Sequence, residues 1–488
     1  MTDPRLRAIF HDLVPLHGFH GSEADVWGPF VWSKRRFAVR KLDTGGAYVA
    51  RLCFNGDEGV LNIRAKGAVG KAISIRRGWN NYPLDFSDVG PADIEFEMSY
   101  VPPVPGDSRQ LGIMVRSIRA LESLQALGEI ENSLSNKFLN DQEFAYGRVA
   151  LESLPQQLRI AFEARCNMKP HCVYCDWERS KSEETDSPFR LSHEKLIEMG
   201  AFFSLAERVG DCSCGEPLLN TDFSKVVSRL HRSGKPLSVA TNGQLLDSSN
   251  RCALMGKDVE LYLSLDAASR ESYARYRNKK FDLVVDNLRA LCHGRPLGTL
   301  PNVIAAFICM KSNLDEFPSF VDLMKEVGVD GIRVTSLNTY PHLMKRVARR
   351  GGSEFRYGQE SMTSEEFNRF LTDARTAASA RSMPMLPYSD FMAEDAHVNG
   401  PLCNEPWKTI NAATRGLVMC VFNHGAIVAR WSEQGQRATE EFLFDVWNGE
   451  VYREIRSDLA QGRFSRLCVA SCPIARRTPK ETREKSRR

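Results

Sequence analysis

Three cysteines, Cys166, Cys172 and Cys175, lie within one stretch of ten residues. An alternating apolar run over residues 158–164 precedes them, so we expect a strand that delivers the thiols to a loop at its end. Three thiolates can hold three irons of a 4Fe-4S cluster and leave the fourth iron open to a small molecule with adjacent amine and carboxylate groups. A zinc ion completed by His171 or by a fourth cysteine is the alternative, which the spacing alone does not exclude.

A second group of cysteines lies toward the C-terminus. Thirteen cysteines are many for a protein of a reducing compartment, where disulfides rarely persist, so we expect the clustered thiols to ligate a metal or an iron–sulfur group. The C-terminal group consists of Cys403, Cys420, Cys468 and Cys472, and the scattered cysteines are Cys53, Cys212, Cys214, Cys252, Cys292 and Cys309.

The composition is that of an ordinary globular protein, with 42% hydrophobic, 26% charged and 9% aromatic residues. The length of 488 residues predicts about three domains. We expect a cytoplasmic protein without a signal peptide or a membrane span, because the first residues lack an apolar run and no uncharged stretch approaches about 18 residues. The net charge of +4 is concentrated in residues 476–488, which predicts a solvated, disordered basic tail and not a nucleic-acid-binding protein.

Residues 1–120 alternate with a period of two, as in Ile94, Phe96 and Met98, between turns rich in Gly, Asp, Asn and Pro. This pattern predicts an antiparallel β-sandwich. From residue 117 the spacing of Ile118 and Leu121 becomes helical, so we expect a helical connector over residues 121–152.

Strands and helices alternate from Leu158 to Leu337 in about six βα units. Such a repeat implies parallel strands with right-handed crossovers, and six units favour a partial (β/α)6 TIM-like barrel over a closed barrel. Ser192 is the predicted cap of one helix, and Thr221 is the predicted cap of a helix over residues 222–232 that ends at Gly234.

Polar residues follow several of these strands at the end where a parallel sheet presents functional groups. Taken singly, each is most simply explained by a strand-end or cap hydrogen bond. Together, they should lie on the same rim as the cysteine loop. They are Gly215-Glu216-Pro217, Thr241-Asn242, Ser264 and Asp266.

The cysteine loop resembles the radical S-adenosylmethionine (radical SAM) superfamily, whose usual signature is C-x3-C-x2-C with an aromatic residue before the last cysteine. Tyr174 fills the aromatic position, whereas the first gap is two residues longer here. Gly215-Glu216-Pro217 matches the GGEP-type motif of that family, with Cys214 where a first glycine is common. The Thr241-Asn242-Gly243 turn and the Tyr273-x3-Arg277 segment look like further landmarks of the family.

The resemblance implies a 4Fe-4S cluster on Cys166, Cys172 and Cys175 with S-adenosylmethionine bound beside it. The 215–217 backbone would meet the methionine amino group of S-adenosylmethionine. Ser264 or Asp266 would contact the ribose, and Arg277 would contact the methionine carboxylate. Tyr174 and Asn242 would complete the cofactor site.

The C-terminal cysteines resemble the SPASM/twitch extension of the same family, which holds one or two auxiliary iron–sulfur clusters. Four cysteines fit one auxiliary 4Fe-4S cluster and not two. The closing C-x3-C departs from the more usual C-x2-C, and a structural zinc is the alternative. The expected domains are a sandwich over 1–120, a connector over 121–152, the barrel over 153–395, the small iron–sulfur domain over 396–475 and the tail over 476–488.

The resemblance implies that an electron from a flavodoxin- or ferredoxin-type donor cleaves S-adenosylmethionine to a 5′-deoxyadenosyl radical, which abstracts a substrate hydrogen atom. The substrate radical could then be oxidised by the auxiliary cluster or receive a hydrogen from a thiol, giving an oxidoreductase or an epimerase. Cys309 and Cys214 are the candidate thiols, although free cysteines on strands more often fill cores.

Two substrate classes fit this chemistry. We favour a sugar, an aminocyclitol or a glycan precursor, because a β-sandwich and a single auxiliary cluster are compatible with such small substrates. The alternative is a ribosomal peptide or a protein such as a sulfatase. A third hypothesis has no enzyme at all, only a zinc-stabilised scaffold that binds a partner.

Overall fold

The computed structural model describes most of the chain, and the basic tail and the expected boundary near residue 395 lie outside the described residues. The described residues are 9–10, 13–25, 28–42, 46–65, 70–103, 107, 109, 111–121, 124–175, 190–295, 300–337, 342–350, 352–386, 401–420, 423, 426–431, 438–468 and 472.

The N-terminal part is a single six-stranded antiparallel sheet. Strand β3 bends so that residues 47–53 pair with β6 while residues 61–65 pair with β5, and β2 pairs with both β5 and β6. The circuit β2–β5–β3–β6 therefore closes on itself around an apolar core. The antiparallel prediction is confirmed, but the two separate sheets of a sandwich are replaced by one curled sheet. The strands are β1 (Leu13–Asp25), β2 (Gly28–Lys41), β3 (Ala47–Ala65), β4 (Lys71–Asp85), β5 (Ala92–Met98) and β6 (Met114–Leu121).

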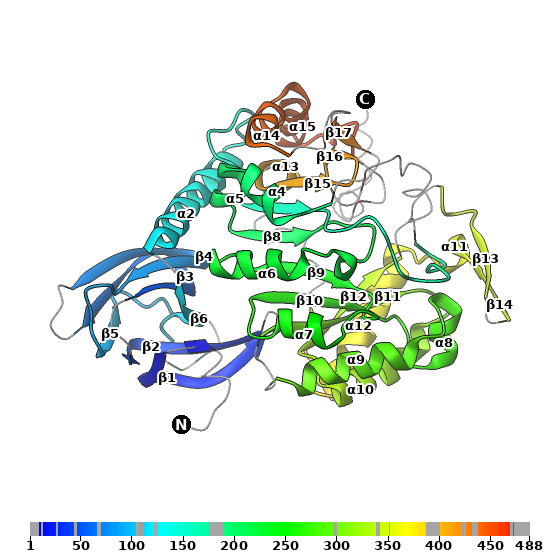
Figure 1. Cartoon of the computed structure of the whole chain (residues 1–488), viewed down its shortest axis with the longest axis horizontal. Helices are drawn as coiled ribbons and strands as arrows, with labels where there is room; N and C mark the ends of the chain where they lie inside the picture. The colour runs from blue at the N-terminus through cyan, green and yellow to red at the C-terminus, as the bar shows by residue number, and fades with distance from the viewer. Residues whose placement is uncertain are drawn as a thin grey trace.

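The helical connector begins later than its apolar spacing predicted. Ile118 and Leu121 belong to strand β6, where they face Ala50 and Ala47 of β3, and helix α2 spans Leu124–Ala145. The helical spacing was misleading because pairing with a distant strand overrides local periodicity. Helix α2 packs against β4 and runs from the N-terminal sheet toward the rest of the molecule (Figure 1).

The second sheet has nine strands in the order β12-β11-β10-β9-β8-β7-β15-β16-β17. The six strands from β7 to β12 are parallel and lie in chain order, as the βα repeat predicted. The parallel strands are β7 (Gln157–Ile160), β8 (Arg208–Asp211), β9 (Leu237–Thr241), β10 (Val259–Ser264), β11 (Asn302–Cys309) and β12 (Gly331–Ser336). The helices between and after them are α4 (His193–Glu198), α5 (Ala201–Leu205), α6 (Phe223–Arg232), α7 (Ser248–Leu254), α8 (Arg270–Tyr276), α9 (Phe281–His293), α10 (Phe317–Val327) and α12 (Ser364–Ala380).

The helix caps show how local sequence sets these elements. The Ser192 side chain accepts the N–H of Lys195 at the start of α4, which confirms that prediction. Thr221 does not cap α6, because the cap position of the helix is Asp222, one residue later. The side chain of Asn220 accepts the N–H of Asp222. The apolar face of α6 is buried as predicted, and Gly234 follows with a positive φ of 71°.

The two faces of the parallel sheet differ in polarity. Residues of one parity, such as Leu263 of β10 and Phe307 of β11, are buried in the core formed with the helices. The opposite face carries polar and small residues, including the Arg208–Glu260 ion pair at 3.0 Å and the exposed Ala240 of the inner strand β9, together with a small buried cluster of Tyr262, Ile304 and Leu386. Because successive side chains of a strand point to opposite faces of the sheet, the position of a residue along its strand decides which face its side chain occupies.

The C-terminal residues extend the same sheet. Strand β15 (Thr409–Ala413) pairs in parallel with β7, and β16 (Gly416–Val418) and β17 (Ile427–Arg430) continue antiparallel. Buried Trp407 and Trp447 belong to the same core cluster as the parallel strands. The remaining elements are β13 (Val347–Arg350), β14 (Ser353–Arg356), α11 (Tyr357–Glu360), α13 (Glu405–Lys408), α14 (Glu440–Trp447), α15 (Glu450–Ala460) and the short helices η1 (Pro217–Leu219) and η2 (Leu314–Glu316).

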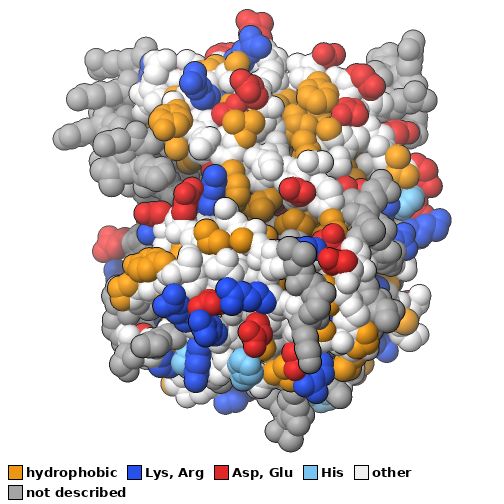
Figure 2. Space-filling view, turned by 90° about the vertical axis from the view of Figure 1, so that its left-hand side faces the viewer, with side chains coloured by type: hydrophobic (Ala, Val, Ile, Leu, Met, Phe, Trp, Pro, Cys, Tyr) orange, Lys and Arg blue, Asp and Glu red, His pale blue; other side chains and the backbone are white. Residues whose placement is uncertain are grey.

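A buried arginine of the N-terminal sheet contacts helix α6 and the turn before β10. Arg119 of β6 donates to the carbonyl of His231 over 2.9 Å and lies 3.6 Å from the Asp258 carboxylate. Figure 2 looks onto the side that carries the N-terminal sheet, where Lys and Arg side chains in the lower half are interspersed with Asp and Glu. Arg36 with Glu97 and Arg40 with Asp93 are examples of such pairing. No helix within the described ranges is both long enough and apolar enough to cross a membrane.

Candidate functional site

The three cysteines of the first group gather in one apolar cluster beyond the end of β7. Cys172 is buried, and Cys166 and Cys175 are half-buried, among side chains that include Met168, Val173 and Tyr276. The N–H of Val173 donates to the carbonyl of Tyr276 over 2.9 Å, which ties the loop to helix α8. Burial raises the pKa of Cys166 to about 11 and also raises the pKa of Cys172. Thiols in such a place become thiolates when a metal or another positive group offsets the burial.

The Gly215-Glu216-Pro217 turn lies directly against the start of this loop. The N–H of Glu216 donates to the carbonyl of Arg165 over 2.8 Å. A Cβ atom added to Gly215 would stand 2.4 Å from that carbonyl oxygen and 2.5 Å from the carbonyl oxygen of Glu163. The close approach of two backbones explains the glycine, and Pro217 opens the short helix η1.

The Glu216 side chain joins the loops that follow β8 and β9. It is 1% exposed, and its carboxylate accepts the Thr241 hydroxyl over 2.7 Å and the Asn242 N–H over 2.8 Å. Burial raises the pKa of Glu216 to about 7, against the lowering effect of these hydrogen bonds. Glu216 is therefore a buried connector between two strand-end loops.

Asn242 continues this connection to the cysteine loop. Its amide donates to the side chain of Asn167 over 2.7 Å, and the side chains of Gln244 and Asn278 donate to the sulfur of Met168. The buried Gln244 Oε1 has no hydrogen-bond partner within the described part of the chain. The same holds for the buried hydroxyl of Tyr273, which lies within electrostatic reach of Cys172 and Glu216. These two orphaned polar groups beside the thiols suit a polar ligand.

Asp266 lies at the centre of the rim with a φ of 61° and no exposed surface. Its Oδ2 atom accepts Nε of Arg277 over 2.9 Å, Nη2 of Arg277 and the hydroxyl of Tyr174, while its Oδ1 accepts the N–H of Ile308 over 2.8 Å. The carboxylate is thus fully engaged with protein donors. Ser264, in contrast, is partly exposed on the polar face of β10.

The structure separates the two candidate hydrogen donors from each other. Cys309 is fully buried in the core formed with the helices, on the same face of β11 as Phe307, which packs on Phe317 and Phe320. The cluster around the cysteine loop instead contains its neighbours Ile308 and Met310. Strand alternation turns the Cys309 side chain to the opposite face from these two neighbours, so its burial does not favour a donor role, which stays a prediction. Cys214 is half-buried between β8 and Gly215, and its role stays a prediction.

The sequence analysis did not identify two arginines near the loop. Arg346 donates through Nη1 to the carbonyl of Cys175, and Arg350 of β13 donates to the carbonyl of Arg277 and lies within electrostatic reach of Cys172. The basic run around residues 346–350 was the available signal.

The four C-terminal cysteines also approach one another. Cys403 lies within electrostatic reach of Cys420 and Cys472, and Cys468 lies within reach of Cys472. Burial raises the pKa of Cys403 strongly and that of Cys468 to about 11. Within the described residues, no three His, Cys, Asp or Glu side chains converge tightly enough for a single metal ion. A 4Fe-4S cube presents separate irons to separate thiolates, so its ligands do not need that convergence.

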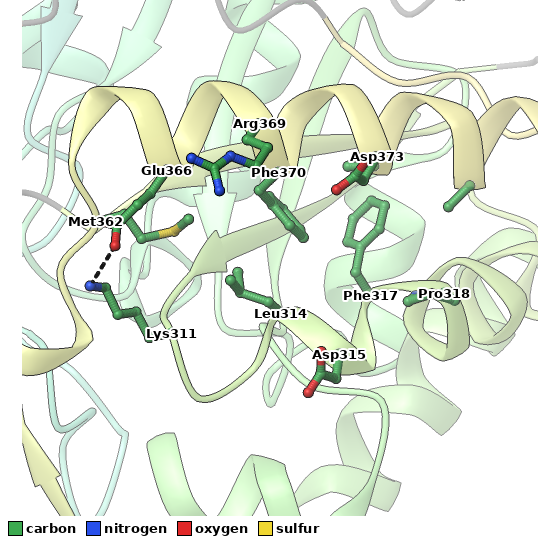
Figure 3. A pocket seen from close by; sticks show the side chains of 12 residues that line it. Lys311, Leu314, Asp315, Phe317, Pro318, Met362, Glu366, Arg369, Phe370 and Asp373 are labelled. Carbon is green, nitrogen blue, oxygen red and sulfur yellow. Dashed lines mark hydrogen bonds and ion pairs between the residues drawn. The ribbon is translucent and has the colours of Figure 1, made fainter.

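A cavity of about 600 Å³ that no cysteine lines lies between η2 with α10 and helix α12 (Figure 3). Leu314, Phe317 and Phe370 point into it, and the Lys311–Glu366 ion pair at 2.8 Å stands at its edge. None of the candidate site residues lines this cavity.

Comparison with protein families supports the cysteine site. Residues 162–300 match the family model described as the radical SAM superfamily. The matched range contains the cysteine loop, Glu216, Asn242, Asp266 and Arg277. The C-terminal cysteines lie outside that range.

Similar proteins are distant. One relative is a Pyrococcus furiosus protein described as a tungsten-containing aldehyde ferredoxin oxidoreductase cofactor-modifying protein. It is 23% identical to this chain over 185 residues, which are 37% of this chain and 51% of the relative. This chain therefore spans about half the length of the relative. The structure of Streptococcus suis SuiB bound to S-adenosylmethionine has a TM-score of 0.48 at 16% identity, covering 72% of this chain and 76% of SuiB. The structure of anSMEcpe with bound AdoMet and a Cp18Cys peptide has a TM-score of 0.45 at 16% identity, covering 66% and 86%.

Proposed function

We propose, because residues 162–300 match the radical SAM family model, that the chain binds a 4Fe-4S cluster through Cys166, Cys172 and Cys175 and uses S-adenosylmethionine to abstract a hydrogen atom from its substrate. The family implies both the cluster and S-adenosylmethionine. The observation that carries the proposal is the gathering of three buried or half-buried thiols in one cluster beside the Glu216–Asn242 connection.

The residues around the thiols suit these groups. The close backbone contact at Gly215 places the 215–217 turn against the cysteine loop. Gln244 Oε1 and the Tyr273 hydroxyl are buried polar atoms without a hydrogen-bond partner within the described residues. A bound cluster would supply the electron, and S-adenosylmethionine would supply the group that abstracts the hydrogen atom. The chain's own tasks are to orient S-adenosylmethionine and the substrate and to exclude water, and the apolar surroundings of Cys172 serve the second task.

The polar face of the parallel sheet is the proposed substrate surface. The partly exposed Ser238, Ser264, Arg333 and Thr335 and the exposed Ala240 lie on it, near the rim that carries the cysteine loop. Hydroxyl and guanidinium groups suit a polar, hydroxylated substrate, so a sugar, an aminocyclitol or a glycan precursor stays the proposed class. Oxidation and epimerisation both stay proposed outcomes, because Cys309 faces away from this surface while the half-buried Cys214 remains a candidate donor.

The C-terminal cysteines are the proposed ligands of one auxiliary 4Fe-4S cluster in a SPASM/twitch-like extension. Their mutual approach supports this assignment. The anaerobically reconstituted protein should then contain about eight irons with matching sulfide, and Cys420→Ala should lower the content to about four. Zinc without sulfide would exclude both clusters and favour the scaffold hypothesis.

The radical step has its own experiment. The reconstituted protein should form 5′-deoxyadenosine from S-adenosylmethionine under a strong reductant, and Cys166→Ala should abolish this activity. Cys292→Ala is the matched control, because Cys292 is a buried thiol of helix α9 within the core formed with the helices. Metabolite and glycan profiling of a strain lacking the protein then tests the substrate class, and a changed peptide in place of a changed sugar would overturn it.

A further inference from the structure

Arg277 is more deeply engaged with the protein than a cofactor-binding side chain needs to be. It is 4% exposed, and each of its guanidinium nitrogens has a protein partner. Nε and Nη2 donate to Oδ2 of Asp266, and Nη1 lies 3.7 Å from Sγ of Cys172. The guanidinium also lies over the ring of Tyr174, 5.6 Å from its centroid.

The surrounding elements hold this arrangement in place. Asp266 receives the Tyr174 hydroxyl and the Ile308 N–H, and its carbonyl accepts the side chain of Asn313 over 3.2 Å. The N–H of Arg277 donates to the carbonyl of Tyr273 over 2.7 Å. A buried ion pair of this kind persists when additional hydrogen bonds satisfy both partners, as they do here.

We propose that Arg277 is a positioning residue of the cluster site: Asp266 orients its guanidinium so that Nη1 donates to the Cys172 thiolate, in place of a contact with the methionine carboxylate of S-adenosylmethionine. The inference rests on the proposed function, because it concerns Cys172 as a cluster ligand. Arg350, which is partly exposed and lies within electrostatic reach of Cys172, and Arg346, which donates to the Cys175 carbonyl, are two further cations beside the loop that a carboxylate could approach.

The electrostatic consequence has a definite sign. A hydrogen bond to a ligating sulfur and a nearby positive charge stabilise the more negative, reduced cluster, which raises its reduction potential. Removing the guanidinium should therefore make the potential of this cluster more negative. A residue that contacts only S-adenosylmethionine would instead change the affinity for S-adenosylmethionine.

The experiment compares Arg277→Gln with Lys279→Gln in the full-length reconstituted protein. Both variants lose one positive charge from the same segment, but Lys279 is exposed. We expect Arg277→Gln to keep the wild-type iron content, to show a more negative midpoint potential in an EPR-monitored titration, and to bind S-adenosylmethionine within about threefold of the wild type. Lys279→Gln should match the wild type in all three measurements. An unchanged potential in Arg277→Gln, or a loss of S-adenosylmethionine affinity of about tenfold or more, as expected for a lost charge-assisted contact, overturns the proposal.

A conservative variant covers the case in which Arg277→Gln fails to hold iron. Arg277→Lys keeps the charge, so a wild-type iron content with a potential near that of the wild type supports the proposal. Loss of iron from Arg277→Lys as well contradicts it. The wild-type protein is measured first, because a wild type without about four irons on the first cysteine group, or without 5′-deoxyadenosine formation, refutes the proposed function and not this inference.

Discussion

The backbone N–H of Asn242 donates to Oε2 of Glu216 over 2.8 Å, in a place where the glutamate is 1% exposed. This contact joins the loop after β8 to the loop after β9, and Asn242 carries the connection on to Asn167 of the cysteine loop. The Glu216 carboxylate thus joins two strand-end loops directly and reaches the cysteine loop through Asn242, so a change in its protonation should affect all three.

The raised pKa of Glu216 predicts a pH dependence of stability. Burial raises this pKa to about 7 from the ordinary 4.5. The folded protein holds the proton more tightly than the unfolded chain, so the stabilisation is complete below a pH of about 4.5 and is lost as the pH rises through about 7. The loss should be roughly 3 kcal/mol, at about 1.4 kcal/mol per pKa unit. Glu216→Gln should remove this decrease of the free energy of unfolding with rising pH, as measured by denaturant unfolding across that pH range. Glu271→Gln, at an exposed position of α8, should keep the slope; equal slopes in both variants would refute the assignment.

Gly215→Ala should damage the site through sterics alone. The new Cβ would stand 2.4 Å and 2.5 Å from two backbone oxygens of the cysteine-loop segment, so the loop must shift. We expect destabilisation of about 1–3 kcal/mol and a reduced iron content after reconstitution, measured by thermal unfolding and iron analysis. Gly90→Ala is the control, since nothing lies within 4 Å of its added Cβ. Normal iron uptake by Gly215→Ala would show that the backbones are not in close contact.

Asp266→Asn should be strongly destabilising although it preserves the side-chain size. The substitution leaves the Arg277 guanidinium buried without its counter-charge, and such a change typically lowers the free energy of unfolding by about 3–5 kcal/mol. The exposed ion pair between Arg270 and Asp282, with 2.7 Å from Nε to Oδ2, provides the comparison. Asp282→Asn should lower the free energy of unfolding by less than about 1 kcal/mol. Denaturant unfolding of the two variants measures the difference. Similar midpoints would mean that the Asp266 carboxylate contributes no more than a surface charge.

Cys309→Ala should leave the chemistry intact. The side chain faces the core formed with the helices, so the substitution removes about one methyl-sized group and should cost about 1 kcal/mol of stability. Iron content and the rate of 5′-deoxyadenosine formation should equal those of the wild type. A variant with full iron that no longer forms 5′-deoxyadenosine would place Cys309 beside the cluster site, whereas a hydrogen-donor role, which acts after the abstraction, would appear only as a changed product of the substrate.

Much of the architecture was predictable because its signals are local. The period-two runs identified the strands of the N-terminal sheet, and the βα repeat identified six parallel strands in chain order. The cysteine spacing together with Gly215-Glu216-Pro217 predicted the match of residues 162–300 to the radical SAM family model, since close backbone approach and thiolate ligation demand particular residue types at particular positions.

Other features depended on contacts between residues far apart in the sequence. Ile118 has helical spacing but pairs with β3, and β15 joins β7 across about 250 residues of chain, so the C-terminal cysteines extend the same sheet. Strand register alone turned Cys309 away from the polar face of the sheet. Local sequence predicted which thiols and which glycine turn would gather beyond the strand ends, and the structure brings Cys166, Cys172, Cys175 and Gly215 together there. Only the tertiary structure decided which charges surround them, because the pairing of Asp266 with Arg277 and the approach of Arg350 arise from packing between separate elements.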